Sequence, residues 1–192
     1  RLFLGNISIT NLSKLFGNTV KRSKKQISFH YDLGNDFYQN WLDKTMTYSS
    51  GIFDNKSIKL ENAQVNKYES LIKVANIKKN DEVLEIGAGW GGFLKYVKDK
   101  IGSNIIGITI SNKQYQYIKN NLNLSTNVKL QDYRKVNGIY DKIISIEMFE
   151  AVGKKNWNTY FKTIQKKLKQ NGVAALQIIT IDEEKYPFYE KN

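Results

Sequence analysis

The sequence predicts a Rossmann-like α/β protein with a doubly wound, mostly parallel sheet and helices on both faces. Two observations favour this class. From residue 82 onward, short apolar runs alternate with helix-compatible stretches, as they do in βαβ units. The first apolar run leads into the glycine-rich turn Gly87-Ala88-Gly89-Trp90-Gly91-Gly92. Sheets of this kind bind ligands at the carboxyl ends of their strands, so the turn is a candidate binding loop.

The elements follow from the spacing of apolar residues and from the turn residues between them. Strands are expected at Glu82–Ile86, Asn104–Ile110, Val128–Gln131, Tyr140–Ile146 and Gly172–Ile181. Helices are expected at Leu60–Ile77, Gly91–Lys100, Asn112–Asn121 and Trp157–Leu168, with a short one at Asn35–Leu42. We expect residues 1–25 to form an N-terminal arm or the remainder of a preceding domain, and residues 26–192 to form one domain.

Composition narrows the function. The 192 residues include no cysteine, which excludes disulfides, zinc–thiolate sites and a cysteine nucleophile, and no metal site is predicted. No apolar run is long enough to span a bilayer. The net charge of +12 favours a polyanionic partner, either an anionic membrane or nucleic acid. A lysine-rich solvated surface explains the same charge.

Glu85 precedes the glycine turn. A carboxylate there repels phosphate and attracts a cation such as an ammonium group. No lysine, serine or threonine of a P-loop follows the last glycine, which disfavours a nucleoside triphosphate. The pattern Glu-x-Gly-x-Gly-x-Gly resembles motif I of the S-adenosylmethionine (SAM) methyltransferases. A dinucleotide site and a purely structural turn are the alternatives.

Polar groups also follow the second and third strands. After the second, Thr109 to Gln114 can bind a ribose, or Ser111 can cap the next helix. After the third, Asp132 can accept from an adenine amino group while Tyr133 packs on the ring. A loop salt bridge between Asp132 and Arg134 is the alternative for that position.

The fourth strand ends in two carboxylates, Glu147 and Glu150. Two carboxylates at a strand end are costly to desolvate unless they have partners or a chemical role. A solvated loop would explain one of them easily and both less easily.

Several segments together resemble the cyclopropane-fatty-acyl-phospholipid synthase family, which includes the mycolic acid cyclopropane synthases. They are His30-Tyr31-Asp32-Leu33-Gly34-Asn35-Asp36-Phe37-Tyr38, Thr47-Tyr48-Ser49-Ser50, Leu84 to Gly92, Ile108 to Ser111, Gln131 to Arg134 and Met148-Phe149-Glu150-Ala151-Val152-Gly153. The resemblance runs from about residue 26 to residue 180. It implies that residues 26–192 are a class I SAM-dependent methyltransferase domain that ends before the family's C-terminal helices.

The resemblance also implies a reaction. The family transfers a methyl group from SAM to a cis double bond of an unsaturated phospholipid acyl chain, through a carbocation, and a bound bicarbonate is the catalytic base. We therefore expect a cytoplasmic enzyme, peripheral on the anionic inner membrane face, that binds no nucleic acid; a homodimer is an open option. The alternatives are a SAM-dependent methyltransferase of a small molecule or nucleic acid, and a noncatalytic module that binds SAM or membranes.

The resemblance assigns site residues by position. Catalytic positions are Glu150, Tyr31, Ser50 and Gln177. Cofactor-binding positions are Tyr48, Ser49, Glu85, Gly87, Ala88, Gly89, Thr109, Ile110, Gln114, Asp132 and Tyr133. His30, the only histidine, suits the edge of the site or a structural role equally.

Two of these positions depart from the family pattern. Ser50 stands where the family usually has cysteine, and Gln177 stands where ring-forming members commonly have histidine. An amide can donate to an anion but cannot carry a proton away. The product is therefore either a cyclopropane or a methylene- or methyl-branched chain.

Overall fold

Five parallel strands form one sheet at the centre of the protein, in the order β3-β2-β1-β4-β5. The structure is a computed structural model that describes residues 35–186. The strands are β1 (Glu82–Ile86), β2 (Asn104–Thr109), β3 (Val128–Leu130), β4 (Tyr140–Ile146) and β5 (Leu168–Gln177). β1 is the middle strand, and the strand order reverses between it and β4. The predicted doubly wound parallel sheet is confirmed.

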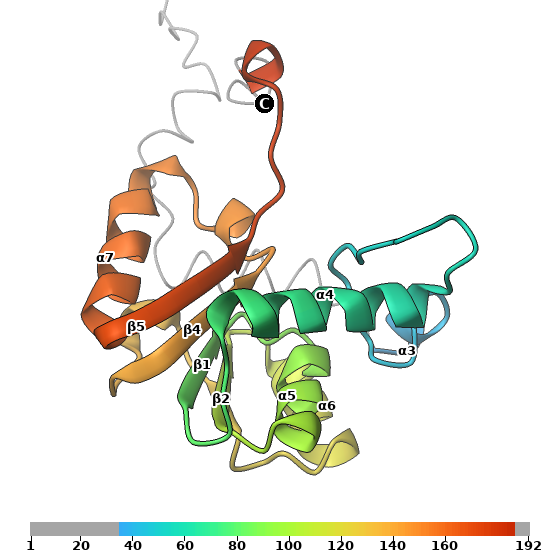
Figure 1. Ribbon diagram of the computed structural model, residues 1–192, viewed down its shortest axis with the longest axis horizontal. Coiled ribbons are helices and arrows are strands. Elements are labelled where there is room, and N and C mark those ends of the chain that lie inside the picture. The colour runs from blue at the N-terminus through green and yellow to red at the C-terminus, as the bar shows by residue number, and fades with distance from the viewer. Residues whose placement is uncertain (1–34, 187–192) are drawn as a thin grey trace, which may run out of the picture.

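Helices cover both faces of the sheet (Figure 1). The α-helices are α3 (Asn35–Gln39), α4 (Leu60–Ala75), α5 (Gly92–Lys100), α6 (Asn112–Asn121) and α7 (Trp157–Lys167). Short 3-10 turns occur at Tyr133–Lys135, Phe149–Ala151, Lys154–Asn156 and Glu183–Lys185. No helix among residues 35–186 combines the length and the apolar character that crossing a membrane requires.

The strand side chains alternate between two cores. Val83 on β1 packs in a cluster with side chains of α4, α5 and α6. Its neighbours Leu84 and Ile86 point to the other face, where they pack with Tyr160 and Ile164 of α7. This period of two is the expected consequence of strand geometry. It also fixes the direction of Glu85, which points to the same face as Val83.

The last strand differs from the prediction. The polar run Lys169-Gln170-Asn171-Gly172 suggests a turn, yet β5 begins at Leu168 directly after α7 and ends at Gln177. A bulge accommodates this run, because the pairing register shifts between Tyr140 and Lys142 and Asn171 has a positive φ of 64°. Ile179 and Ile181 lie beyond the sheet and are exposed. The predicted strand therefore stands four residues too late at each end.

Candidate functional site

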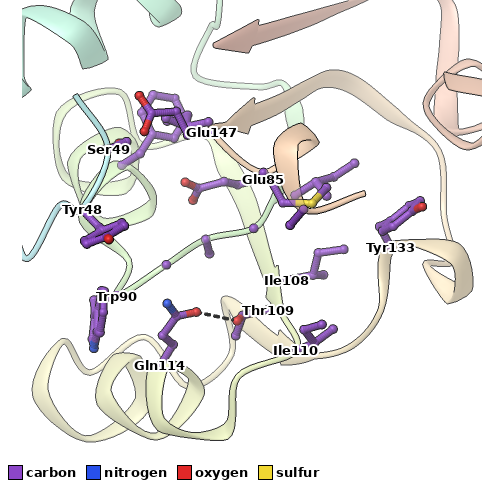
Figure 2. A pocket seen from close by; sticks show the side chains of 18 of the residues that line it. Tyr48, Ser49, Glu85, Trp90, Ile108, Thr109, Ile110, Gln114, Tyr133 and Glu147 are labelled. Atoms are coloured by element: carbon purple, nitrogen blue, oxygen red, sulfur yellow. Dashed lines mark hydrogen bonds between the residues drawn. The ribbon is translucent and has the colours of Figure 1, made fainter. Parts of the chain in front are cut away.

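A cavity of about 460 Å³ opens at the carboxyl ends of the strands. Every residue predicted to bind the cofactor lines it: Tyr48, Ser49, Glu85, Gly87, Ala88, Gly89, Thr109, Ile110, Gln114, Asp132 and Tyr133. Figure 2 shows Glu85 near the middle, with Tyr48 and Ser49 on one side and Tyr133 on the other. The fold thus brings together residues from sequence positions 48 to 133 around one space, at the switch in strand order where such sheets bind ligands.

The glycine turn forms the floor of this cavity. Gly87 and Gly89 have positive φ values of 84° and 54°, which a residue with a Cβ adopts only at a cost. The backbone N–H groups of Gly87 and Ala88 donate to the Ile108 carbonyl at 3.0 Å, which ties the turn to β2. A Cβ added at Gly89 would have no atom within 4 Å. The space in front of Gly89 is therefore open to a ligand.

Glu85 is a buried carboxyl group, only 2% exposed, in the wall of the cavity. Burial raises its pKa from 4.5 to about 8, against the attraction of Lys67 and a hydrogen bond from the Leu94 backbone. Among the described residues, no group hydrogen-bonds to its Oε2 atom. A buried carboxyl oxygen without a partner is costly, and a cationic or hydroxyl-bearing ligand would supply that partner.

Lys67 of α4 is fully buried beneath Ser49. Its Nζ donates to the Ser49 hydroxyl at 2.6 Å. Burial lowers the pKa of Lys67 from 10.5 to about 8, although Glu147, Asp43 and Glu85 attract its charge. Gln64, on the same helix, donates from its side-chain amide to the Ser49 carbonyl at 2.7 Å. α4 therefore holds the segment that carries Tyr48 and Ser49 against the rim of the cavity.

Hydrogen bonds link Thr109, Ser111 and Gln114 between the end of β2 and the start of α6. The Thr109 hydroxyl donates to Gln114 Oε1 at 2.8 Å (Figure 2). The Ser111 hydroxyl accepts from the Gln114 backbone N–H at 3.3 Å, so Ser111 caps α6. The capping role proposed for Ser111 is confirmed.

Asp132 forms the salt bridge that the sequence offered as its alternative role. Arg134 donates from Nε to Asp132 Oδ1 at 2.8 Å and from Nη2 to Oδ2 at 2.6 Å. Burial alone would raise the pKa of Asp132, but these bonds and the Arg134 backbone N–H outweigh it and lower the pKa. The carboxylate is therefore charged and fixed in orientation. Asp132 still lines the cavity beside Tyr133, where a contact with adenine stays a prediction.

A second carboxylate, that of Glu147, lies at the end of β4 on the same side of the cavity as Ser49 (Figure 2). Its Oε1 accepts from the Ser50 backbone N–H at 3.0 Å, the Ser50 hydroxyl at 2.7 Å and the Gln177 amide at 2.8 Å. Glu147 has a positive φ of 46°, which costs a non-glycine residue about 1–2 kcal/mol. Ser50 and Gln177, both predicted to be catalytic, thus meet at Glu147.

Of the other two residues predicted to be catalytic, Glu150 is described by the structure and Tyr31 is not. Glu150 lines the cavity, and its Oε1 accepts from the Ile179 backbone N–H. Its side chain is otherwise exposed to solvent. Tyr31 and His30 lie outside the described residues.

Lys67, Trp90 and the role of Glu147 were not predicted from the sequence. Trp90 is 2% exposed, lines the cavity, and donates from Nε1 to Asn35 Oδ1 at 2.8 Å. It thereby joins the glycine turn to α3. Lys67 gives one usable signal, a lysine on the apolar stripe of an amphipathic helix. The hydrogen-bond partners of Glu147 are distant from it in the sequence. The residues around Glu147 therefore give no sequence signal for its role.

Comparisons with known proteins identify the family of this chain. The family described as "Mycolic acid cyclopropane synthetase" matches residues 18–190. The cyclopropane-fatty-acyl-phospholipid synthase of Escherichia coli K12 is 38% identical over 151 residues, covering 78% of this chain and 39% of the relative. The tuberculostearic acid methyltransferase UfaA1 of Mycobacterium tuberculosis is 34% identical over 172 residues, covering 83% of this chain and 40% of the relative.

Solved structures show the same fold. Mycolic acid cyclopropane synthase CmaA1, complexed with SAH and CTAB, superposes with a TM-score of 0.75 at 28% identity, covering 80% of this chain and 55% of that one. The cyclopropane synthase MmaA2 of Mycobacterium tuberculosis has a TM-score of 0.79 at 26% identity, covering 87% of this chain and 61% of that one. The chain spans about 40% of the length of the curated relatives it matches. The fold and the matched residues show that this chain belongs to the mycolic acid cyclopropane synthetase family.

Proposed function

We propose that this chain carries the methyl-transfer site of an enzyme that modifies a cis double bond in the acyl chain of an unsaturated phospholipid, with SAM as methyl donor. One observation carries the proposal: the residues that the family resemblance assigns to SAM, from Tyr48 to Tyr133, line a single cavity. The names of two relatives, a cyclopropane-fatty-acyl-phospholipid synthase and a tuberculostearic acid methyltransferase, support the same reaction class. The product is a cyclopropane or a methylene- or methyl-branched chain.

The residues present fit SAM. The unpartnered Oε2 of Glu85 suits a ligand with a cation or hydroxyl groups, and the open face of Gly89 admits a ligand against the backbone. Lys67 holds the Ser49 hydroxyl at 2.6 Å, and we assign Ser49 to the SAM carboxylate on the basis of the resemblance. When bound, SAM supplies an electrophilic methyl group on a sulfonium.

An alkene is a weak, uncharged nucleophile, so the chain's task is to align it and exclude water. The rings of Tyr48 and Tyr133 line the cavity. Aromatic faces attract cations, so these rings suit a reaction in which positive charge appears on the acyl chain. Glu150 lines the same cavity, and we assign it to the reacting end on the basis of the resemblance.

Bicarbonate is the part of this proposal that the described residues fit least. The resemblance gives it Glu150 and Tyr31 as partners, together with Ser50 and Gln177. The Ser50 N–H and the Gln177 amide, however, both donate to Glu147. A second anion at those donors would face the Glu147 carboxylate, and like charges at contact distance repel. We therefore assign no step of the reaction to bicarbonate.

We also propose that the protein acts at an anionic membrane surface. The net charge is +12, and five large apolar side chains between residues 37 and 53 are exposed: Phe37, Trp41, Tyr48, Ile52 and Phe53. Trp41 packs edge-to-face on Tyr48, with ring centroids 5.7 Å apart, and Tyr48 lines the cavity. Basic charge with exposed aromatic rings is typical of interfacial binding. Binding of nucleic acid is not part of the proposal, and a homodimer stays a prediction.

The test uses the intact protein, unsaturated phospholipid vesicles and SAM with a labelled methyl group. Mass spectrometry of the released acyl chains should show a gain of one CH2 that carries the label, and fragmentation then separates a ring from a branch. Glu150→Gln should retain SAM binding and lose turnover, whereas Glu61→Gln, an exposed glutamate of α4, should behave like the wild type. Label that never enters lipid, despite SAM binding, would refute the proposal in favour of another acceptor or a noncatalytic module.

A further inference from the structure

Three hydrogen-bond donors from distant parts of the chain converge on one oxygen of Glu147. The Ser50 N–H and hydroxyl come from the segment before α4, 97 residues away in sequence, and the Gln177 amide comes from the end of β5, 30 residues away. Gln177 also donates to the Ser50 hydroxyl at 3.1 Å, which closes the group. A set of donors aimed at one point is an anion cradle, and here the anion is a side chain of the protein.

The backbone supports this placement. Glu147 has a φ of 46°, a conformation that favours glycine. Its backbone N–H donates to the Gln177 carbonyl at 2.9 Å, so the same two residues pair through main chain and side chain. A glutamate kept in a glycine conformation points to a role for its side chain. The Glu147 carboxylate also attracts the charge of Lys67.

Among residues 35–186, the hydrogen bonds to the Glu147 carboxylate all go to one of its two oxygens. The three donors go to Oε1, and no residue between 35 and 186 donates to Oε2 in the hydrogen bonds described. Glu147 lines the cavity together with Glu85 and the glycine turn. The anchored oxygen fixes the group, while the second oxygen can receive a proton from a molecule in the cavity.

We propose that Glu147 is the proton acceptor of the reaction and stands in place of an external anion such as bicarbonate; this inference rests on the function proposed above. Methyl transfer breaks the carbon–sulfur bond, leaves its electron pair on sulfur and forms a bond to one alkene carbon. The other alkene carbon then carries a positive charge. Glu147 takes a proton from the added methyl group, and the electron pair of that C–H bond forms the third side of the ring. Loss of a neighbouring chain proton to Glu147 instead gives the branched product.

The reaction releases one proton, and Glu147 of this protein accepts it. Alkene and methyl sulfonium become ring, sulfide and one proton, which Glu147 holds and then releases to water. Glu150 is a weaker candidate for this step, because it accepts from the Ile179 N–H and is exposed to solvent. A carboxylate fixed to the fold also needs no binding equilibrium for the base, unlike a bicarbonate taken from solution.

The experiment compares wild type, Glu147→Gln and Glu147→Gly. Glutamine retains the acceptor oxygen for Ser50 and Gln177 but is not a base, so turnover should fall at least about 100-fold while SAM binding by calorimetry stays within about threefold. Glycine suits the φ of 46° and empties the cradle. The Glu147→Gly variant should therefore bind 13C-labelled bicarbonate, which NMR detects as line broadening. It should turn over only when bicarbonate is added.

Wild type should show neither the line broadening nor any dependence on bicarbonate. The proposal is overturned if wild type broadens the bicarbonate signal and needs bicarbonate for turnover, or if Glu147→Gln remains fully active. The NMR measurement needs no turnover, so it still decides whether Glu147 fills the cradle if the enzyme proves to have another acceptor. Failure of the proposed function would appear separately, as SAM binding without label in lipid.

Discussion

The ammonium group of Lys67 lies 2.6 Å from the hydroxyl of Ser49 although Lys67 is fully buried. A buried ammonium is costly unless nearby groups offset its lost hydration. Here Ser49 supplies an acceptor, while Glu85, Glu147 and Asp43 supply negative charge. The lysine thus joins α4, the segment before it and two carboxylates of the cavity wall into one electrostatic unit.

Lys67→Met should weaken SAM binding at least about tenfold, because it removes both the cation and the group that orients Ser49. Lys73→Met is the matched control on α4, where Lys73 is exposed, and should change the affinity less than twofold. Isothermal calorimetry at pH 7 would measure both. Equal affinities for the two variants would contradict the role of Lys67.

Glu85 should make stability depend on pH. Because burial raises its folded-state pKa from 4.5 to about 8, the folded protein holds a proton that the unfolded chain releases between these values. The stabilisation from that proton is present below pH 4.5 and is lost as the pH rises toward 8, by at most about 1.4 kcal/mol per pH unit. Urea denaturation of the ligand-free protein should therefore show wild type losing stability relative to Glu85→Gln across this range. Parallel curves for the two proteins would contradict the shift.

The same carboxyl should make SAM affinity depend on pH. A bound cation favours ionised Glu85, so binding releases a proton whenever the free protein holds one. The affinity of wild type should rise by up to about tenfold per pH unit between pH 6 and 8. Glu85→Gln should bind much more weakly and with a flat profile. Calorimetry in two buffers of different ionisation enthalpy would count the released proton directly.

Gly89→Ala and Gly91→Ala should separate binding from stability. Both glycines have positive φ, but a Cβ at Gly89 meets no atom within 4 Å, whereas one at Gly91 would lie 2.9 Å from side-chain carbons of Ile118 and Leu122. Gly89→Ala should cost about 1 kcal/mol of stability from its backbone conformation and weaken SAM binding severely. Gly91→Ala should cost about 2 kcal/mol or more, measured by thermal denaturation. A reversed order would contradict the assignment of the open space to a ligand.

Asp132→Asn should loosen the turn at Tyr133–Lys135. The change removes the charge that holds Arg134 through two hydrogen bonds, so SAM affinity should fall about tenfold if the adenine lies there. Asp99→Asn breaks an exposed ion pair with Lys95 instead and should leave affinity unchanged. A tenfold loss in both variants would point to a general effect of charge.

The sequence predicts most of the sheet because its strands and helices have short-range signatures. β1, β4 and α6 have the predicted bounds, since apolar period and flanking turn residues determine them locally. β5 was misplaced because a bulge lets polar residues continue the pairing with β4, and no local pattern marks a bulge. Glu147 was noted but received no partner for a related reason. Its three donors come from residues 50 and 177, and contacts at such separation depend on the complete topology.

The segment at residues 45–50 has a consequence for how small the functional unit can be. Its residues lie before β1, yet hydrogen bonds with Lys67, Gln64 and Glu147 hold them at the cavity. A fragment that starts at β1 would keep all five strands but would leave one wall of the cavity missing and Glu147 without two of its three donors. The smallest fragment that keeps the whole site is therefore larger than the Rossmann-like sheet. It must include the stretch that precedes α4.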